Sequence, residues 1–146
     1  GGEGCLMIFD IDNFKGVNDR LGHSAGDSLL KDVAAILRGR LRQSDIVGRL
    51  GGDEFVALLR NVPETIAEEK ARELLTAISD LPDRDGNRVT VSIGYAFSPS
   101  NGATFAELYR AADRALYMAK RSWKNRCCSV TCADVPMQPS EPANTH

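Results

Sequence analysis

Acidic residues stand at two places that a small sheet would bring together. Asp10 and Asp12 close an apolar run over residues 5–10, and Asp53 and Glu54 follow a pair of glycines. If the two segments are neighbouring strands, up to four carboxylates converge, and like charges raise one another's pKa unless a cation neutralises them. Carboxylate oxygens favour Mg²⁺ or Mn²⁺, which keep several waters and bind phosphate groups. The spacing therefore indicates a divalent cation that holds a phosphate ligand.

Each of these signals also has an ordinary structural explanation. An Asp-x-Asp pair is common in turns, and paired glycines are common in hairpins. Asn18 and Asp27 are residue types that are favoured near helix ends for backbone reasons. Lys15 and Lys120 belong to a residue type that is mostly solvent-exposed. The chemical interpretation therefore depends on the signals occurring together.

The hydrophobic pattern predicts four strands and four helices in a single domain. Continuous or alternating apolar runs predict strands over residues 5–10, 46–50, 55–59 and 89–97. Apolar positions at helical spacing predict helices over residues 13–21, 26–41, 63–81 and 105–119. This order matches the ferredoxin-like βαββαβ arrangement, an α+β fold in which helices cover an antiparallel sheet.

Local signals predict where the elements begin and end. Capping boxes are predicted at Ser24–Asp27 and Thr104–Glu107. Gly22 is predicted to end the first helix, and Gly51 and Gly52 to supply the positive φ angles of a tight hairpin turn. That turn would set the second acidic pair beside the end of the first strand.

The composition excludes several classes of protein. The chain has 146 residues with 18 Lys and Arg against 20 Asp and Glu, a formal net charge of −2, so a basic surface for nucleic acid is not expected. The apolar run near the start ends in a carboxylate, so neither a transmembrane segment nor a secretory signal is predicted, and a cytoplasmic location is expected. The four cysteines lack the spacing of a zinc site and are expected to be reduced thiols.

The end of the chain differs in composition from the rest. Three prolines and few large apolar residues follow residue 128. Such a segment buries too little apolar surface to fold, so residues 129–146 are predicted to be a disordered tail and residues 1–128 the domain.

The string from Gly51 to Phe55 is Gly-Gly-Asp-Glu-Phe, and with it the chain resembles the diguanylate cyclase family, which carries the GGDEF signature. Further segments resemble the family in the same order: Phe9–Lys15, Asn18–Asp19, Leu21–Asp27, Val91–Gly94 and Ala112–Lys120. The resemblance implies an enzyme that joins two GTP molecules into the second messenger cyclic di-GMP and releases two pyrophosphates. It also implies a homodimer, because each subunit presents one GTP to the other.

The resemblance further implies the roles of the acidic residues. Asp10, the backbone carbonyl of Ile11 and Asp53 would bind Mg²⁺ or Mn²⁺, and Glu54 would complete the acidic site. The catalytic set would be Asp53, which is also the suggested proton acceptor, with Glu54 and the phosphate-binding Lys15.

The same resemblance implies the contacts with substrate. Asn18 and Asp27 would bind the guanine edge, Asp27 by accepting from its donor pair, which adenine lacks. For His23, a place in the nucleotide pocket and a plain surface position remain equally open. The complete set of expected substrate contacts is Asn13, Phe14, Lys15, Asn18, His23, Asp27, Lys120 and Lys124.

A second ligand site and two departures from the family bear on regulation. Arg42 and Asp45 resemble the family's inhibitory Arg-x-x-Asp site for cyclic di-GMP, although the same spacing is common in surface ion pairs. Only four residues precede the first strand, where family domains begin with a helix, and Lys124 stands where the family has an arginine. An alternative hypothesis is therefore a weak or inactive domain that binds cyclic di-GMP or GTP. A purely structural domain is a third hypothesis, but it leaves the acidic residues unexplained.

Overall fold

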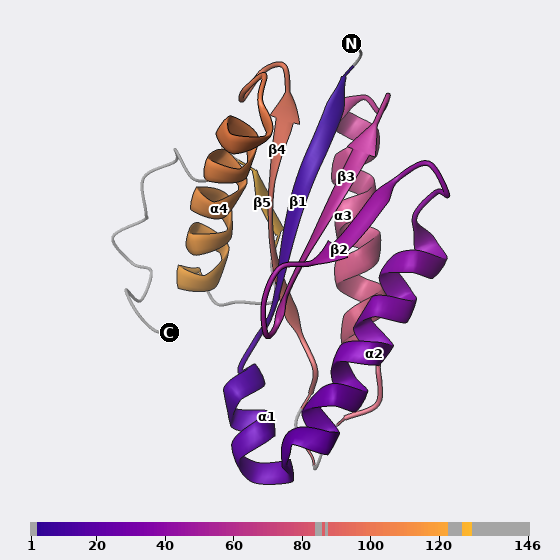
Figure 1. Ribbon diagram of the computed structural model, residues 1–146, viewed down its shortest axis with the longest axis vertical. Coiled ribbons are helices and arrows are strands. Elements are labelled where there is room, and N and C mark those ends of the chain that lie inside the picture. The colour runs from indigo at the N-terminus through magenta and orange to yellow at the C-terminus, as the bar shows by residue number, and fades with distance from the viewer. Residues whose placement is uncertain (1–2, 84–85, 87, 123–126, 130–146) are drawn as a thin grey trace.

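The computed structural model describes residues 3–83, 86, 88–122 and 127–129, which form one sheet flanked by helices (Figure 1). The strands are β1 (Gly4–Ile11), β2 (Ile46–Arg49), β3 (Glu54–Arg60), β4 (Val91–Ser98) and β5 (Cys127–Ser129). The helices are α1 (Phe14–Leu21), α2 (His23–Arg40), α3 (Glu64–Ser79) and α4 (Phe105–Arg121). Within these residues no helix has the length and apolar composition that crossing a membrane requires.

The sheet has the strand order β2-β3-β1-β4-β5, with β1 at its centre. β1 is antiparallel to both β3 and β4, and β2 and β3 form a hairpin. The ferredoxin-like α+β fold predicted from the sequence is therefore confirmed.

The sheet is mixed, which corrects the expectation of a purely antiparallel one. β5 adds to the edge of the sheet and runs parallel to β4. A strand of three residues is too short to produce a recognisable alternation, so the sequence pattern could not predict it. Ser129, the first residue of the predicted tail, is the buried last residue of β5, and the rest of that predicted tail lies outside the described residues.

Two layers of apolar side chains explain why the first strand is a continuous apolar run. Alternate residues of a strand point to opposite faces of its sheet. Met7 and Phe9 belong to the cluster beneath α2 and α3, whereas Leu6 and Ile8 belong to the cluster beneath α4. Figure 1 shows α4 on one face of the sheet and α3 on the other. A central strand covered on both faces has no solvent side for polar residues.

The N-terminal boundary of α2 differs from the prediction. The helix begins at His23, and no capping box forms at Ser24–Asp27. One residue, Gly22 at φ 94°, joins α1 to α2: its N–H donates to Asn18 O at 2.8 Å and its carbonyl accepts from Gly26 N at 3.2 Å. Because α2 already begins there, Ser24 lies in the first turn. The second predicted box is confirmed, since Thr104 and Glu107 cap α4 reciprocally.

The hairpin turn forms as expected, but by different geometry. Neither Gly51 nor Gly52 has a positive φ angle. The turn is longer than the two-residue turn that would need such angles, and it closes where Leu50 N donates to Glu54 O at 2.8 Å. A Cβ atom on either glycine would have no neighbour within 4 Å, so no other part of the described chain packs against these two positions.

Candidate functional site

The end of β1 and the hairpin turn meet, as the spacing of the acidic residues predicts. Asp10 is directly opposite Glu54 in the β1–β3 ladder. One residue further, Ile11 N donates to Asp53 O at 3.2 Å. The register of the sheet thus fixes the backbone of Asp53 against the end of the central strand.

Asp10 is a carboxylate in an environment that disfavours its charge. Its Oδ1 atom is buried without a hydrogen-bond partner, and its Oδ2 atom lies 3.3 Å from Lys120 Nζ. Burial raises the pKa of Asp10 to about 7, with Lys120 opposing the rise and Asp53 adding to it. A buried, unpartnered oxygen beside a second carboxylate is a donor set suited to a hard divalent cation.

Glu54 points toward α4. Burial raises the pKa of Glu54, and the charges of Asp113 and Asp53 raise it further, whereas a hydrogen bond with Tyr109 and the charge of Lys120 lower it. Tyr109 is thus a neighbour of the acidic site that the sequence did not indicate.

Both carboxylate oxygens of Asp12 accept hydrogen bonds. Its Oδ2 accepts from Thr90 Oγ1 at 2.7 Å, and its Oδ1 accepts from Ser92 Oγ at 2.7 Å and Lys120 Nζ at 3.1 Å. Sequence reasoning treated Asp12 only as one of the converging acids and gave it no role in the site. Asp12 stands two residues after Asp10, and residues at this spacing in an extended chain point to the same side. This spacing could have indicated that one cation, here Lys120, contacts both carboxylates.

The expected convergence of four carboxylates does not occur in the part of the chain that the structure describes. No group of three or more Asp, Glu, His or Cys side chains there is close enough to hold an ion. Asp12 is turned toward β4 and Glu54 toward α4, which leaves Asp10 and Asp53. The third expected ligand, the backbone carbonyl of Ile11, belongs to the last residue of β1, whose N–H donates to Asp53 O at 3.2 Å.

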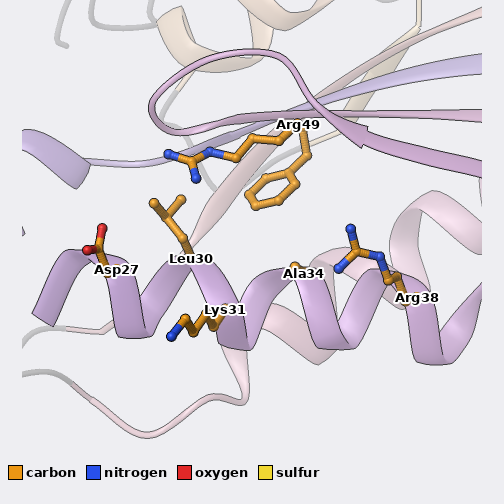
Figure 2. Close-up of a pocket in the computed structure, with 7 residues that line it drawn as sticks. Asp27, Leu30, Lys31, Ala34, Arg38 and Arg49 are labelled. Atoms are coloured by element: carbon orange, nitrogen blue, oxygen red, sulfur yellow. The ribbon is translucent and has the colours of Figure 1, made fainter. Parts of the chain in front are cut away.

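A cavity of about 360 Å³ lies between α2 and the hairpin (Figure 2). It is lined by Asp27, Leu30, Lys31, Ala34, Arg38, Arg49 and Phe55. Figure 2 shows the Asp27 carboxylate on the side of α2 that faces the hairpin, with the Arg49 guanidinium above Leu30. An apolar floor with a carboxylate at one end suits a flat base that carries hydrogen-bond donors.

Arg49 stabilises the turn and was not predicted from the sequence. Its Nε donates to Gly51 O at 2.9 Å and its Nη2 to Gly52 O at 2.8 Å. A guanidinium has five N–H donors in a fixed plane, so it can bind both carbonyls at once. The sequence feature that could have indicated this role is the arginine at the end of β2, two residues before the paired glycines.

The remaining expected nucleotide contacts that the structure describes lie along α1 and at the start of α2. Asn13 has φ 58° and precedes α1, and the side chain of Phe14 is buried in the core. Asn18 Oδ1 is buried without a hydrogen-bond partner, and a Cβ atom on Gly26 would overlap it. Lys15 and His23 are exposed. Lys124 lies outside the described residues.

Arg42 and Asp45 form an ion pair with two side-chain hydrogen bonds on another part of the surface. Arg42 Nη2 donates to Asp45 Oδ1 at 2.8 Å and to Arg60 O at 2.6 Å, and Arg42 Nε donates to Asp45 Oδ2 at 3.2 Å. The Asp45 side chain is 2% exposed and that of Arg42 is 51% exposed. The guanidinium is thus oriented by a buried carboxylate and remains accessible.

Replacing Asp10 should make the protein more stable at neutral pH. The pKa of Asp10 is about 7 against an ordinary 3.8, so its favourable contribution is complete below pH 3.8 and is lost as the pH rises through 7. Asp10→Asn removes this loss, and we expect a gain of about 1–2 kcal/mol at pH 8, less than the full shift implies because the group is partly exposed.

Urea unfolding of both proteins at pH 5 and pH 8, with a chelator present, measures this difference. We expect the advantage of the variant to be larger at pH 8 than at pH 5. An advantage that does not change with pH would contradict a buried, charge-disfavouring environment for Asp10.

Comparisons with known proteins find similar sequences over most of the chain. A family model described as "Diguanylate cyclase, GGDEF domain" matches residues 2–126. The chain is 43% identical over 121 residues to the diguanylate cyclase TpbB of Pseudomonas aeruginosa, covering 80% of this chain and 28% of TpbB. It is 37% identical over 129 residues to the cyclic di-GMP phosphodiesterase PdeR of Escherichia coli, covering 86% of this chain and 19% of PdeR.

A solved structure is similar over most of the chain. It is the GGDEF domain of DgcB from Caulobacter crescentus in complex with c-di-GMP, with a TM-score of 0.80 and 29% sequence identity. The match covers 88% of this chain and 78% of that one. By contrast, the chain spans only about a quarter of the length of the curated relative TpbB.

Proposed function

The chain belongs to the diguanylate cyclase GGDEF domain family, and from this premise we propose that it condenses two GTP molecules into cyclic di-GMP and releases two pyrophosphates. The observation that supports this most is the buried, unpartnered Asp10 Oδ1 beside Asp53 at the GGDEF hairpin. GTP is a nucleotide of the cytoplasm, so we propose that the domain acts there.

We propose that Asp10, the carbonyl of Ile11 and Asp53 hold a divalent cation, Mg²⁺ or Mn²⁺, with Glu54 beside them. The residues fit this role because Asp10 is costly to ionise without a positive charge near its free oxygen. When bound, such a cation lowers the pKa of a sugar hydroxyl and offsets charge on phosphoryl oxygens.

The nucleotide is proposed to lie between the cavity and the hairpin turn. Asp27 would accept hydrogen bonds from the guanine N1–H and exocyclic amine, and Asn18 would bind the same base. The N–H groups of Asn13 and Phe14, free at the start of α1, would bind phosphate oxygens together with Lys15. His23 and Lys124 complete the proposed contacts.

The reaction needs two copies of the chain. The 3′-oxygen of one GTP attacks the α-phosphorus of the other, the bond to pyrophosphate breaks, and the hydroxyl proton passes to an acceptor, for which Asp53 is proposed. Repeating the step in the other direction closes the ring. Since each copy holds one GTP, we propose a homodimer in which the two sites face each other.

Incubation of the chain with GTP or ATP, followed by separation of the products, tests this function. We expect cyclic di-GMP and pyrophosphate from GTP with Mg²⁺ or Mn²⁺, and no cyclic product from ATP. Equal turnover of the two nucleotides would remove Asp27 and Asn18 from guanine recognition.

Binding of cyclic di-GMP without catalysis is the second candidate function, and the Arg42–Asp45 ion pair favours it. PdeR, a phosphodiesterase, contains a segment similar to this one, so likeness to the domain does not by itself fix activity. We propose that Arg42 and Asp45 form a product site, which would inhibit an active domain or serve as the ligand site of an inactive one.

Arg42→Ala should weaken cyclic di-GMP binding. A charge-assisted bidentate contact is strong, so we expect the dissociation constant to rise by about 10- to 100-fold. Isothermal titration calorimetry measures this, with Arg40→Ala as a matched control because Arg40 is exposed nearby and pairs with Glu73 at 3.3 Å. If Arg42→Ala binds cyclic di-GMP with unchanged affinity, Arg42 and Asp45 are a surface ion pair and not a product site.

A further inference from the structure

Lys120 forms ion pairs with two carboxylates, Asp10 and Asp12, which differ in how many other hydrogen bonds hold them. Its Nζ lies 3.3 Å from Asp10 Oδ2 and 3.1 Å from Asp12 Oδ1. The Lys120 side chain is 26% exposed, at the last turn of α4. The ammonium therefore already sits against the carboxylate that is proposed to hold a divalent cation.

Asp12 is fixed where it is. Its side chain is 5% exposed and accepts from Thr90 and Ser92 at 2.7 Å each, and its backbone N–H donates to Thr90 O at 3.0 Å. Asp10, by contrast, has one oxygen without a hydrogen-bond partner. A cation entering at Asp10 would be repelled by the ammonium, and Asp12 offers Lys120 a carboxylate that does not move.

We infer that Lys120 is a resident counterion that competes with the divalent cation for Asp10, and that Asp12 is a positioning residue that retains Lys120 when the cation displaces it. The inference rests on the proposed cation site. Lys120 remains on Asp12, a few ångströms from Asp10, where it can contact a phosphate oxygen of the incoming nucleotide.

Titration of the chain with Mn²⁺ in the absence of nucleotide, with free Mn²⁺ measured by electron paramagnetic resonance, tests this directly. Removing a positive charge next to the ion should tighten binding, so we expect Lys120→Met to lower the Mn²⁺ dissociation constant about tenfold. Lys120→Gln, which keeps a hydrogen-bond donor for Asp12, should act in the same direction. Lys70→Met is the matched control, because Lys70 is 27% exposed and pairs with Glu73 on α3.

The role of Asp12 is tested in two backgrounds. Asp12→Asn leaves Lys120 with Asp10 as its carboxylate, so it should weaken Mn²⁺ binding in the otherwise unchanged protein. The effect should be at least about threefold smaller when Lys120 is already Met, because only the direct loss of one negative charge then remains. A merely structural role for Asp12 would not depend on Lys120.

The outcomes separate this inference from the proposed function. Tighter Mn²⁺ binding in folded Lys120→Met or Lys120→Gln supports it. Measurable binding in the unchanged protein with the same or weaker affinity in both variants overturns the inference and leaves the cation site intact. Absence of Mn²⁺ binding in the unchanged protein at millimolar ion overturns the cation site and the inference with it.

Discussion

Asp53→Asn is expected to reduce the rate of cyclic di-GMP formation by at least about a thousandfold. Asparagine preserves the size of the side chain, and the backbone bond from Ile11 N to Asp53 O does not involve the side chain. The substitution removes the carboxylate that lies beside Asp10 where the hairpin turn meets the end of β1, and with it the proposed acceptor of the hydroxyl proton. We therefore expect a loss of turnover without a loss of fold.

Initial rates of pyrophosphate release, with product identity checked by chromatography, measure this effect. Glu69→Gln is the matched control, because it removes one negative charge from the exposed side of α3. Thermal unfolding of both variants should match that of the unchanged protein within a few degrees. Retained activity in a folded Asp53→Asn variant would exclude Asp53 from both proposed roles.

Gly94→Ala should cost the protein most or all of its stability. A Cβ atom at Gly94 would overlap Ala112 O and Leu116 N, and it would lie 2.6 Å from Leu116 Cα. These are backbone atoms of α4, so no side chain can move aside, and the helix would have to lift from β4. We expect a loss of about 3–5 kcal/mol in the free energy of unfolding, or failure to fold.

Urea unfolding compares this variant with Gly48→Ala, which adds the same methyl group to β2. There the new Cβ atom would meet only Val56 Cγ1, at 3.7 Å, so we expect a change of less than about 1 kcal/mol. Similar losses in the two variants would contradict the close approach of α4 to the sheet at Gly94.

The sequence predicted the fold well where long apolar patterns decide it. The apolar run of β1 is continuous over most of the strand, and the helical spacing of α2 and α4 extends over several turns. The order of the elements then leaves few possible topologies. The boundary of α2 was wrong because a hydrogen-bonded glycine link, not a capping side chain, starts it. β5 was missed because three residues carry no periodicity.

The site was predictable in its location and less so in its internal arrangement. That Asp10 meets the hairpin follows from strand pairing, which the fold class fixes. The direction in which each of the four carboxylates points, toward α4, toward β4 or toward the contact between β1 and the hairpin turn, depends on which polar partners lie nearest. Asp12 turns to Thr90 and Ser92, which are about eighty residues away in the chain, and no local pattern contains that information. The same holds for Tyr109 beside Glu54.

We propose that two copies of this chain together convert GTP into cyclic di-GMP. The most direct test is the initial rate of cyclic di-GMP formation at increasing protein concentration, with Mg²⁺ and separately Mn²⁺, and with a scavenger that removes the product. We expect cyclic di-GMP to form at a rate that rises more steeply than in proportion to protein concentration until dimers predominate. Folded protein that binds GTP but yields no cyclic di-GMP at any concentration would contradict it.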